Sequence, residues 1–220
     1  MITVHHLENS RSQRVLWLLE ELQIPYEVKR YERDKRTMLA PKDLYEVHPV
    51  GKSPVITENA VTVAETGAIF EYIVEAHGAG PLMPERGTPD ARAVTYWLHY
   101  AEGSAMTPLL LKLVFSRLPE NAPFVMKPVV RAVANKTMDG FVDPRLNEHV
   151  DYWERSLERT GWFAGQHFTL ADIMMSFPLE AASTRADLSG KPAIRSFLER
   201  VHAREAYQAA LQRGGPYAYA

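Results

Sequence analysis

The stretch from residue 48 to 72, HPVGKSPVITENAVTVAETGAIFEY, constrains the fold most, because it holds two short strand patterns and a helix start in close succession. Ser53-Pro54 opens the first apolar and β-branched run, and proline fits the first residue of a strand because it has no backbone N–H. Polar turn residues at 58–60 precede a second strand pattern at 61–63. Glu65-Thr66 then stands before an apolar segment with helical spacing. The stretch therefore predicts a β-hairpin that leads into a helix with an acid and a hydroxyl at its start.

The start of this helix suits a zwitterionic ligand. Free N–H groups and the positive end of the helix dipole attract a carboxylate. Glu65 offers a counter-charge for an adjacent ammonium group, and the Thr66 hydroxyl can donate to the carboxylate. Both residues also fit plain helix capping, and the two roles are compatible. If the Ser53-Pro54 bond is cis, the main chain of Ser53 can present its N–H and C=O to an extended peptide.

Composition narrows the class of protein. The chain has 220 residues, of which 46% are hydrophobic and 24% are charged, as in an ordinary globular protein. A net charge of −2 gives no electrostatic indication that the chain binds nucleic acid. The N-terminus lacks the pattern of a signal peptide and no apolar run reaches the ~20 residues of a membrane helix, so we expect a cytoplasmic protein with no integral membrane segment.

Cysteine is absent, which removes disulfides, thiolate metal sites and protein thiol redox chemistry. The histidines show no metal-binding spacing, so we expect no metal. Any sulfur chemistry must come from a ligand that carries its own thiol.

The chain divides at residues 78–89, GAGPLMPERGTP, where glycine and proline interrupt any regular element. Before this point the patterns run βαβ and then αββα, which predicts a thioredoxin-like domain over residues 1–78. The first two strands should be parallel. After a linker at 79–89, residues 90–220 predict an all-helical domain. The fold class is therefore α/β plus all-α.

A capping box, Thr169-Leu170-Ala171-Asp172, begins one of the later helices, with apolar residues at helical spacing behind it. Pro178 lies inside that pattern and predicts a kink or an end of the helix. The box, the 48–72 stretch and the two-domain order together resemble glutathione transferases over essentially the whole chain. The segment Asn9 to Leu16, NSRSQRVL, is most similar to bacterial serine-type members related to the fungal membrane-associated group.

The resemblance implies a homodimer that uses glutathione as co-substrate and joins its thiolate to hydrophobic electrophiles. It implies that Lys52, Ser53, Pro54, Glu65 and Thr66 bind glutathione, with Lys52 on the glycyl carboxylate. It leaves open a glutathione-dependent peroxidase or isomerase on the same scaffold, and a non-catalytic binding module, because a fold does not fix an activity.

The enzyme's task would be to hold glutathione as the thiolate, which is the nucleophile. A hydrogen-bond donor should therefore lie just after the first strand, at the start of the first helix. Ser10 is our first choice, since the serine-type enzymes place the activating serine four residues before an arginine and Arg14 stands at that spacing. Asn9, Arg11 and Ser12 are the alternatives, and Ser12 fits a helix N-cap better.

The electrophile pocket should lie between the domains, against the long helical segment after the linker. Tyr100 and Met106 are the residues that we expect to face it. An aromatic stripe on a helix is also the ordinary mark of a packed core, which is the competing interpretation.

Overall fold

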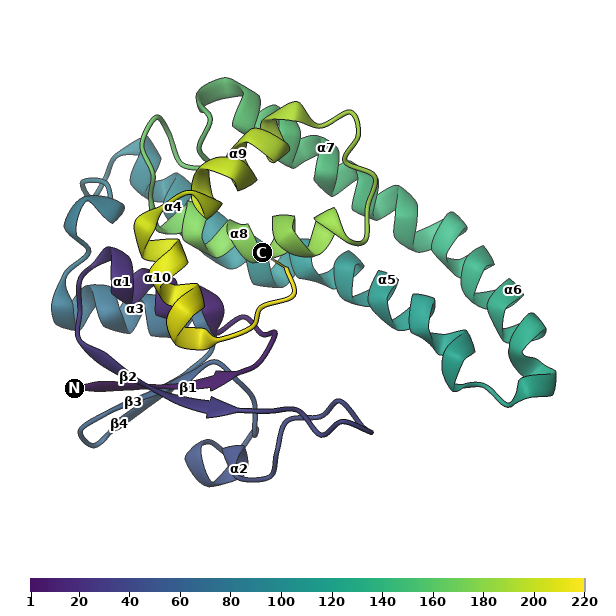
Figure 1. Cartoon of the computed structure of the whole chain (residues 1–220). Helices are drawn as coiled ribbons and strands as arrows, with labels where there is room; N and C mark the ends of the chain where they lie inside the picture. Colours follow the sequence, from purple (N-terminus) through teal and green to yellow (C-terminus); the bar gives the residue numbers. More distant parts are fainter. Residues whose placement is uncertain (220) are drawn as a thin grey trace.

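The computed structural model describes residues 1–219. A four-stranded sheet of order β2-β1-β3-β4 forms the base of the N-terminal part (Figure 1). β1 and β2 are parallel, whereas β3 runs antiparallel to β1 and to β4. The strands are β1 (Ile2–Leu7), β2 (Tyr26–Tyr31), β3 (Val55–Glu58) and β4 (Val61–Ala64). The thioredoxin-like topology and the parallel first pair are confirmed.

The N-terminal helices are α1 (Gln13–Glu21), α2 (Leu44–Val47) and α3 (Thr66–His77). α1 follows β1 after a short turn, and its apolar residues Val15, Leu16 and Leu19 are fully buried. The hairpin predicted from the 48–72 stretch is formed by β3 and β4, and α3 begins directly after it. This order brings the start of α1 and the start of α3 to the same part of the sheet.

The remainder of the described chain is helical (Figure 1). Its main helices are α4 (Pro89–Tyr100), α5 (Met106–Arg117), α6 (Lys127–Thr137), α7 (Asp143–Thr160), α8 (Leu170–Ser183), α9 (Pro192–His202) and α10 (Glu205–Gly214). Short 3₁₀ turns are η1 (Gly80–Leu82), η3 (Leu118–Asn121) and η4 (Phe124–Met126), and π turns are η2 (Ala101–Ala105) and η5 (Met138–Val142). α5 and α6 extend away from the sheet, whereas α10 returns to pack against α1 (Figure 1). Within residues 1–219, no helix combines the length and the apolar character that a bilayer crossing requires.

α8 is the buried centre of the helical part, and the predicted capping box begins it. The Asp172 carboxylate accepts a hydrogen bond from the main-chain N–H of Thr169 at 2.7 Å and from that of Phe163 at 2.9 Å. Both N–H groups are buried, so each would lack a partner without the carboxylate. The box therefore fixes the preceding loop as well as the helix.

Of the two outcomes predicted at Pro178, a kink or an end of the helix, the end does not occur, because α8 continues through this residue to Ser183. Proline has no N–H, which leaves the carbonyl of Met174, one turn earlier, without its helical donor. Arg14 of α1 supplies that donor, since its Nη1 lies 2.7 Å from the Met174 carbonyl oxygen. A buried side chain of α1 thus satisfies the carbonyl that Pro178 leaves without a donor in α8.

Candidate functional site

A cleft of about 250 Å³ opens at the edge of the sheet, and we call it the sheet-edge cleft. Three segments meet there: the β1–α1 loop, the segment before β3, and the junction of β4 with α3. The lining residues are Arg11, His48, Val50, Lys52, Ser53, Pro54, Ala64, Glu65 and Thr66. All five residues that the sequence assigned to glutathione binding therefore lie around one cavity.

Ser53 is fixed to β1 by its side chain. Its Oγ donates to the carbonyl of His5 at 2.8 Å and accepts from the N–H of Leu7 at 3.2 Å. The hydroxyl thus continues the pairing of β1 beyond Val55, where the β1–β3 ladder ends. The Ser53-Pro54 peptide bond is cis, which is the geometry that the sequence left open.

The α3 side of the cleft holds the acid and the hydroxyl. Glu65 has φ 73° and ψ 129°, a main-chain conformation that a residue with a β-carbon adopts only when its surroundings impose it. Thr66 is the first residue of α3 and is 2% exposed. Because the first N–H groups of a helix have no partner within it, this end of α3 offers donors to an anion.

Thr66 is held from behind by Arg14, which is 1% exposed. Nη2 of Arg14 donates to the Thr66 hydroxyl oxygen at 3.3 Å and also pairs with the Glu102 carboxylate of η2. Glu102 pairs as well with Arg11, whose Nε lies 3.2 Å away. Burial would raise the pKa of Glu102, but the two arginines outweigh it and hold that pKa below its usual value.

The charges around the cleft fit a ligand with two carboxylates and one ammonium. Arg11 and Lys52 are cationic and Glu65 is anionic, and among residues 1–219 Lys52 has no ion-pair partner. His48 stabilises the turn that follows it, since its Nδ1 accepts the N–H of Val50 at 3.4 Å. Gly51 has φ 59°, and the Tyr45 ring occupies the space of a β-carbon there, so only glycine fits this turn.

The four candidates for the sulfur donor occupy different positions. Arg11 lines the cleft. Asn9 faces the C-terminal segment, where its Oδ1 accepts the N–H of Ala218 at 2.7 Å. Ser10 and Ser12 are 6% and 0% exposed, and their hydroxyl oxygens lie 2.7 Å apart. Neither serine lines the sheet-edge cleft. Ser10 precedes Arg11 in the β1–α1 loop with its hydroxyl engaged by Ser12, and Ser12 lies wholly in the interior.

Tyr100 and Met106 occupy core positions, which corrects the expected pocket. The Tyr100 hydroxyl accepts from Nε1 of Trp153 at 3.1 Å and pairs with Nδ1 of His149. Met106 is 5% exposed. Tyr100 and Met106 thus have the competing role of a helical core, whereas Tyr96 of the same stripe is 47% exposed. Neither residue lines the sheet-edge cleft.

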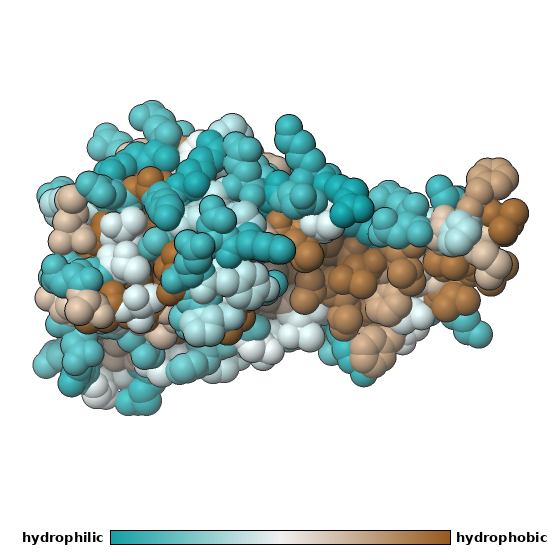
Figure 2. All heavy atoms as spheres, turned by 90° about the horizontal axis from the view of Figure 1, so that it is seen from below, coloured by the Kyte–Doolittle hydropathy of each residue, from teal (hydrophilic) through white to brown (hydrophobic). Residues whose placement is uncertain are grey.

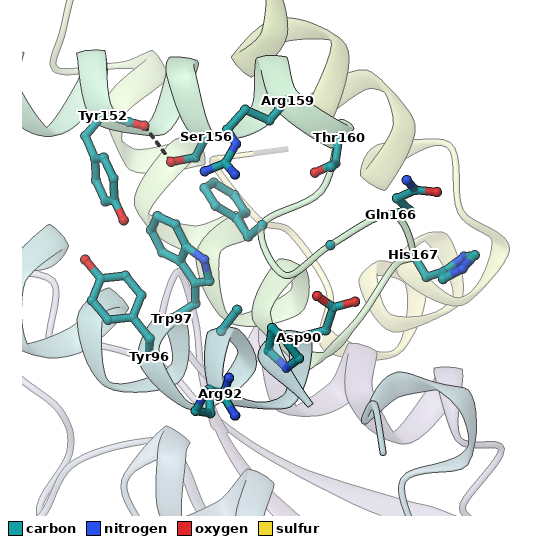
Figure 3. A pocket seen from close by; sticks show the side chains of 14 residues that line it. Asp90, Arg92, Tyr96, Trp97, Tyr152, Ser156, Arg159, Thr160, Gln166 and His167 are labelled. Atoms are coloured by element: carbon teal, nitrogen blue, oxygen red, sulfur yellow. Dashed lines mark hydrogen bonds between the residues drawn. The ribbon is translucent and has the colours of Figure 1, made fainter. Parts of the chain in front are cut away.

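A larger cleft of about 860 Å³ lies on the helical domain, between α4, α7 and the loop before α8 (Figure 3). The rings of Tyr96, Trp97 and Tyr152 gather on one side of it, and Asp90 and Arg159 project from the others (Figure 3). Tyr96 and Trp97 belong to the aromatic stripe of α4 that the sequence offered for the electrophile pocket, whereas Tyr100, Met106 and the residues expected to bind glutathione do not line this cavity. No group of three or more histidine, aspartate or glutamate side chains in residues 1–219 is arranged to hold a metal ion.

Sequence reasoning missed three residues of the site: His6, Arg14 as a structural anchor, and Glu102. Ile2, Val4 and His6 alternate along β1 and are all buried, so His6 lies on the core face. Arg14 is likewise a buried polar residue, and it lies among the buried apolar residues of α1. A polar residue at a core position needs a partner, and that rule was the signal available in the sequence.

Comparisons with known proteins identify the class. The family description "Glutathione S-transferase, N-terminal domain" matches residues 1–75, and "Glutathione S-transferase, C-terminal domain" matches residues 123–213. Glutathione S-transferase 3 of Schizosaccharomyces pombe is 36% identical over 193 residues, which cover 87% of this chain and 78% of the relative. Glutathione S-transferase 1 of Saccharomyces cerevisiae is 31% identical over 223 residues, with 97% and 95% coverage.

Among solved structures, a glutathione S-transferase from Actinobacillus pleuropneumoniae superposes with a TM-score of 0.81 at 27% identity, covering 100% of this chain and 95% of that one. The fold, the matched domains and the relatives agree. This chain belongs to the glutathione S-transferase family.

Proposed function

We propose that this protein is a glutathione transferase that joins the thiolate of reduced glutathione to a hydrophobic electrophile. One observation carries the proposal: the sheet-edge cleft brings Lys52, Ser53-Pro54, Glu65 and Thr66 around a single cavity. Curated relatives that carry the transferase name support it. A sphingomonad transferase of the same fold is known in complex with glutathione.

The cleft suggests an orientation for glutathione. The γ-glutamyl carboxylate meets the N–H groups of α3 and the Thr66 hydroxyl, and the ammonium meets Glu65. The cysteinyl main chain runs along Ser53, and the glycyl carboxylate meets Lys52. The sulfur then points to the β1–α1 loop, where Ser10 donates a hydrogen bond to the thiolate. Nucleophilic attack forms the carbon–sulfur bond and releases the leaving group of the electrophile.

The test combines turnover with a titration of bound thiol. The purified protein should conjugate glutathione to an activated aryl halide. Ser10→Ala should raise the pKa of bound glutathione by about 1 to 2, because a hydrogen bond to a charged group is worth roughly 1.5–3 kcal/mol. Ultraviolet absorbance of the thiolate measures that pKa, and Ser116→Ala on the surface of α5 is the matched control.

Two results would count against the proposal. If several electrophiles gave no turnover above background, the transferase activity would be rejected. If Ser10→Ala left the pKa of bound thiol unchanged, the donor would be another group, and Arg11 would be the next to test because it lines the cleft.

A second candidate activity has a specific observation behind it. The disulfide-bond oxidoreductase YfcG of Escherichia coli is 24% identical to this chain over 221 residues. A glutathione-dependent peroxidase or isomerase on this scaffold would use the same thiolate. This alternative would be favoured if the protein consumed a peroxide or a disulfide, or isomerised a maleyl compound, without conjugating any electrophile. Tight glutathione binding without any turnover would favour a non-catalytic module.

A cytoplasmic location stays a prediction.

We also propose that the protein is a homodimer whose contact includes α5 and α6. Figure 2 shows apolar side chains gathered on the part that projects from the body, which Figure 1 identifies as these helices. The exposed apolar residues there are Leu110, Val114, Leu118, Phe124, Val125, Val129 and Val133. Contiguous exposed apolar surface of this kind marks an interaction site.

Sedimentation should give twice the 24.9 kDa mass of the chain. The double change Val114→Glu and Val133→Glu should produce a monomer, because it would bury charge at the contact. Val61→Glu, at an exposed apolar residue of β4, is the control and should remain dimeric. A monomeric unmodified protein would reject the homodimer.

A further inference from the structure

A chain of buried polar side chains connects β1 with the β1–α1 loop, next to Arg11, which lines the cleft. Nδ1 of His6 lies 2.9 Å from Oγ of Ser12, and Oγ of Ser12 lies 2.7 Å from Oγ of Ser10. All three side chains are at most 6% exposed. The direction of each hydrogen bond follows from which ring nitrogen of His6 carries the hydrogen.

The His6 ring lies against Gly214, at the end of α10. The hydrogen bond to Gly214 raises the pKa of His6, as it does when the ring N–H donates to a carbonyl. Gly214 allows this approach because it lacks a side chain: a β-carbon there would lie 2.8 Å from Oε1 of Gln13 and 3.3 Å from Cε1 of His6. We infer that Nε2 carries the hydrogen, because Nδ1 is the nitrogen that contacts Ser12 and the bond to Gly214 then falls to Nε2. In this tautomer Nδ1 has a free lone pair.

His6 stays neutral at ordinary pH. Burial lowers its pKa to about 4, with a further contribution from the nearby cation Arg30 of β2. The neutral Nδ1 accepts the single hydroxyl hydrogen of Ser12, whose other available acceptor, the Leu7 carbonyl, is 3.4 Å away. With that hydrogen used, Oγ of Ser12 can only accept, so Ser10 must donate to it. Ser10 accepts in turn from the main-chain N–H of Ser12 at 3.3 Å.

We propose that His6 is a positioning residue of the thiol site: acting through Ser12, it turns the Ser10 hydroxyl hydrogen inward, so that Ser10 meets glutathione first as an acceptor. Ser10 accepts the S–H hydrogen of the thiol, and it donates to the sulfur only after the thiol has ionised and the bond to Ser12 has been released. This inference rests on the proposed function, in which Ser10 contacts the sulfur.

The thiol proton does not remain on His6. A base with a pKa of about 4 competes for a proton with a thiolate whose free thiol has a pKa of ~8.5, a disadvantage of more than about 10⁴-fold. When the S–H bond breaks, the proton passes to solvent, and His6 keeps its Nε2 hydrogen throughout. Its role is to fix the direction of the hydroxyls and not to act as the base.

The proposal predicts an unusual sign. Ser12→Ala removes the inward acceptor, and His6→Phe frees the Ser12 hydrogen to donate to Ser10. In both variants the Ser10 hydrogen is left for the sulfur. The pKa of bound glutathione should fall by about 0.5 to 1, the equivalent of one neutral hydrogen bond, and the thiolate fraction well below that pKa should rise about three- to tenfold.

His5→Phe is the matched control. His5 is the neighbouring buried histidine of β1, but its ring contacts the hydroxyls of Tyr31 and Thr57 and not Ser12. This variant should leave the pKa of the bound thiol unchanged. A general loss of order at the site would raise that pKa or abolish binding, so a fall in the His6 and Ser12 variants is not explained by structural damage.

Isotope-labelled histidine NMR of the unmodified protein tests the same point without a variant. It should show His6 neutral with hydrogen on Nε2. The opposite tautomer would overturn the proposal, and so would an unchanged or raised thiol pKa in folded His6→Phe and Ser12→Ala. If glutathione fails to bind, or if Ser10→Ala changes nothing, the proposed function fails instead, and the NMR result still reports on the direction of the chain.

Discussion

Two hydroxyls belong to the segments that form the sheet-edge cleft: Thr66 lines it, and Ser10 directly precedes Arg11, which lines it. The groups packed behind each hydroxyl set its hydrogen in the opposite direction. At the α3 end, the cation Arg14 donates to the Thr66 oxygen, so the Thr66 hydrogen is free to face a ligand carboxylate. At the β1–α1 end, the neutral ring of His6 takes the hydrogen of Ser12, and Ser10 turns inward. The same functional group is thus a ready donor at one end and a conditional donor at the other.

The contrast shows how each end can be tuned separately. A donor committed to the ligand favours binding in every protonation state of the thiol. A donor that must first release an internal partner acts only when the sulfur carries the charge, because a charge-assisted hydrogen bond is stronger than the neutral one it replaces. Affinity for glutathione should therefore depend on the α3 end, and the pKa of the thiol on the β1–α1 end.

The largest expected effect tests whether the sulfur end is built on a neutral histidine. The pKa of His6 is about 4 in the folded protein and 6.5 in the reference state. Because the unfolded chain binds a proton more readily, this group's contribution to stability is complete above pH 6.5 and is lost as the pH falls to about 4. The loss in the free energy of unfolding is at most about 3 kcal/mol.

Reversible chemical denaturation between pH 7 and pH 4 measures it as the difference between the unmodified protein and His6→Phe. The stability of the variant relative to the parent should rise steadily as the pH falls. A difference that does not depend on pH would show that the pKa of His6 is the same in the folded and the unfolded chain. The fold would then not keep the ring neutral, and the contrast between the two ends would be lost.

The parts of the site that sequence reasoning found are those encoded by neighbours in the chain. Ser53-Pro54, the hairpin turn and Glu65-Thr66 follow one another within the 48–72 stretch, and local turn and helix-start chemistry is readable there. The capping box at Thr169 is equally local. Each of these elements forms as predicted, because the rule and the residues that satisfy it are on the same segment.

The parts that were missed depend on contacts between distant segments. No pattern in residues 170–183 shows that Arg14 would supply the donor that Pro178 lacks, so the local rule predicted a kink or an end at a residue where the helix does not end. His6 and Gly214 lie near opposite ends of the chain. Tyr100 and Met106 show the converse: the family resemblance placed them at the pocket, but Tyr100 bonds to Trp153 of α7 and both residues are buried in the core.

The smallest effect sharpens the comparison at the α3 end. Thr66→Val keeps the shape of the side chain and removes the hydroxyl, so the ligand carboxylate loses one donor. A hydrogen bond to a charged group is worth roughly 1.5–3 kcal/mol, which corresponds to a rise in the KM for glutathione of about tenfold or more. Steady-state kinetics and the thiolate titration should show this rise with the pKa of the bound thiol unchanged.

Thr66→Ser retains the donor and should restore the KM, which distinguishes loss of the hydroxyl from damage to the start of α3. Ser10→Ala should give the reverse pattern, with a raised thiol pKa and a nearly unchanged KM. If Thr66→Val shifted the thiol pKa as strongly as Ser10→Ala does, the two ends would be coupled. Arg14 would then be the route to examine, because it contacts Thr66 and also, through Glu102, shares a carboxylate with Arg11 of the β1–α1 loop.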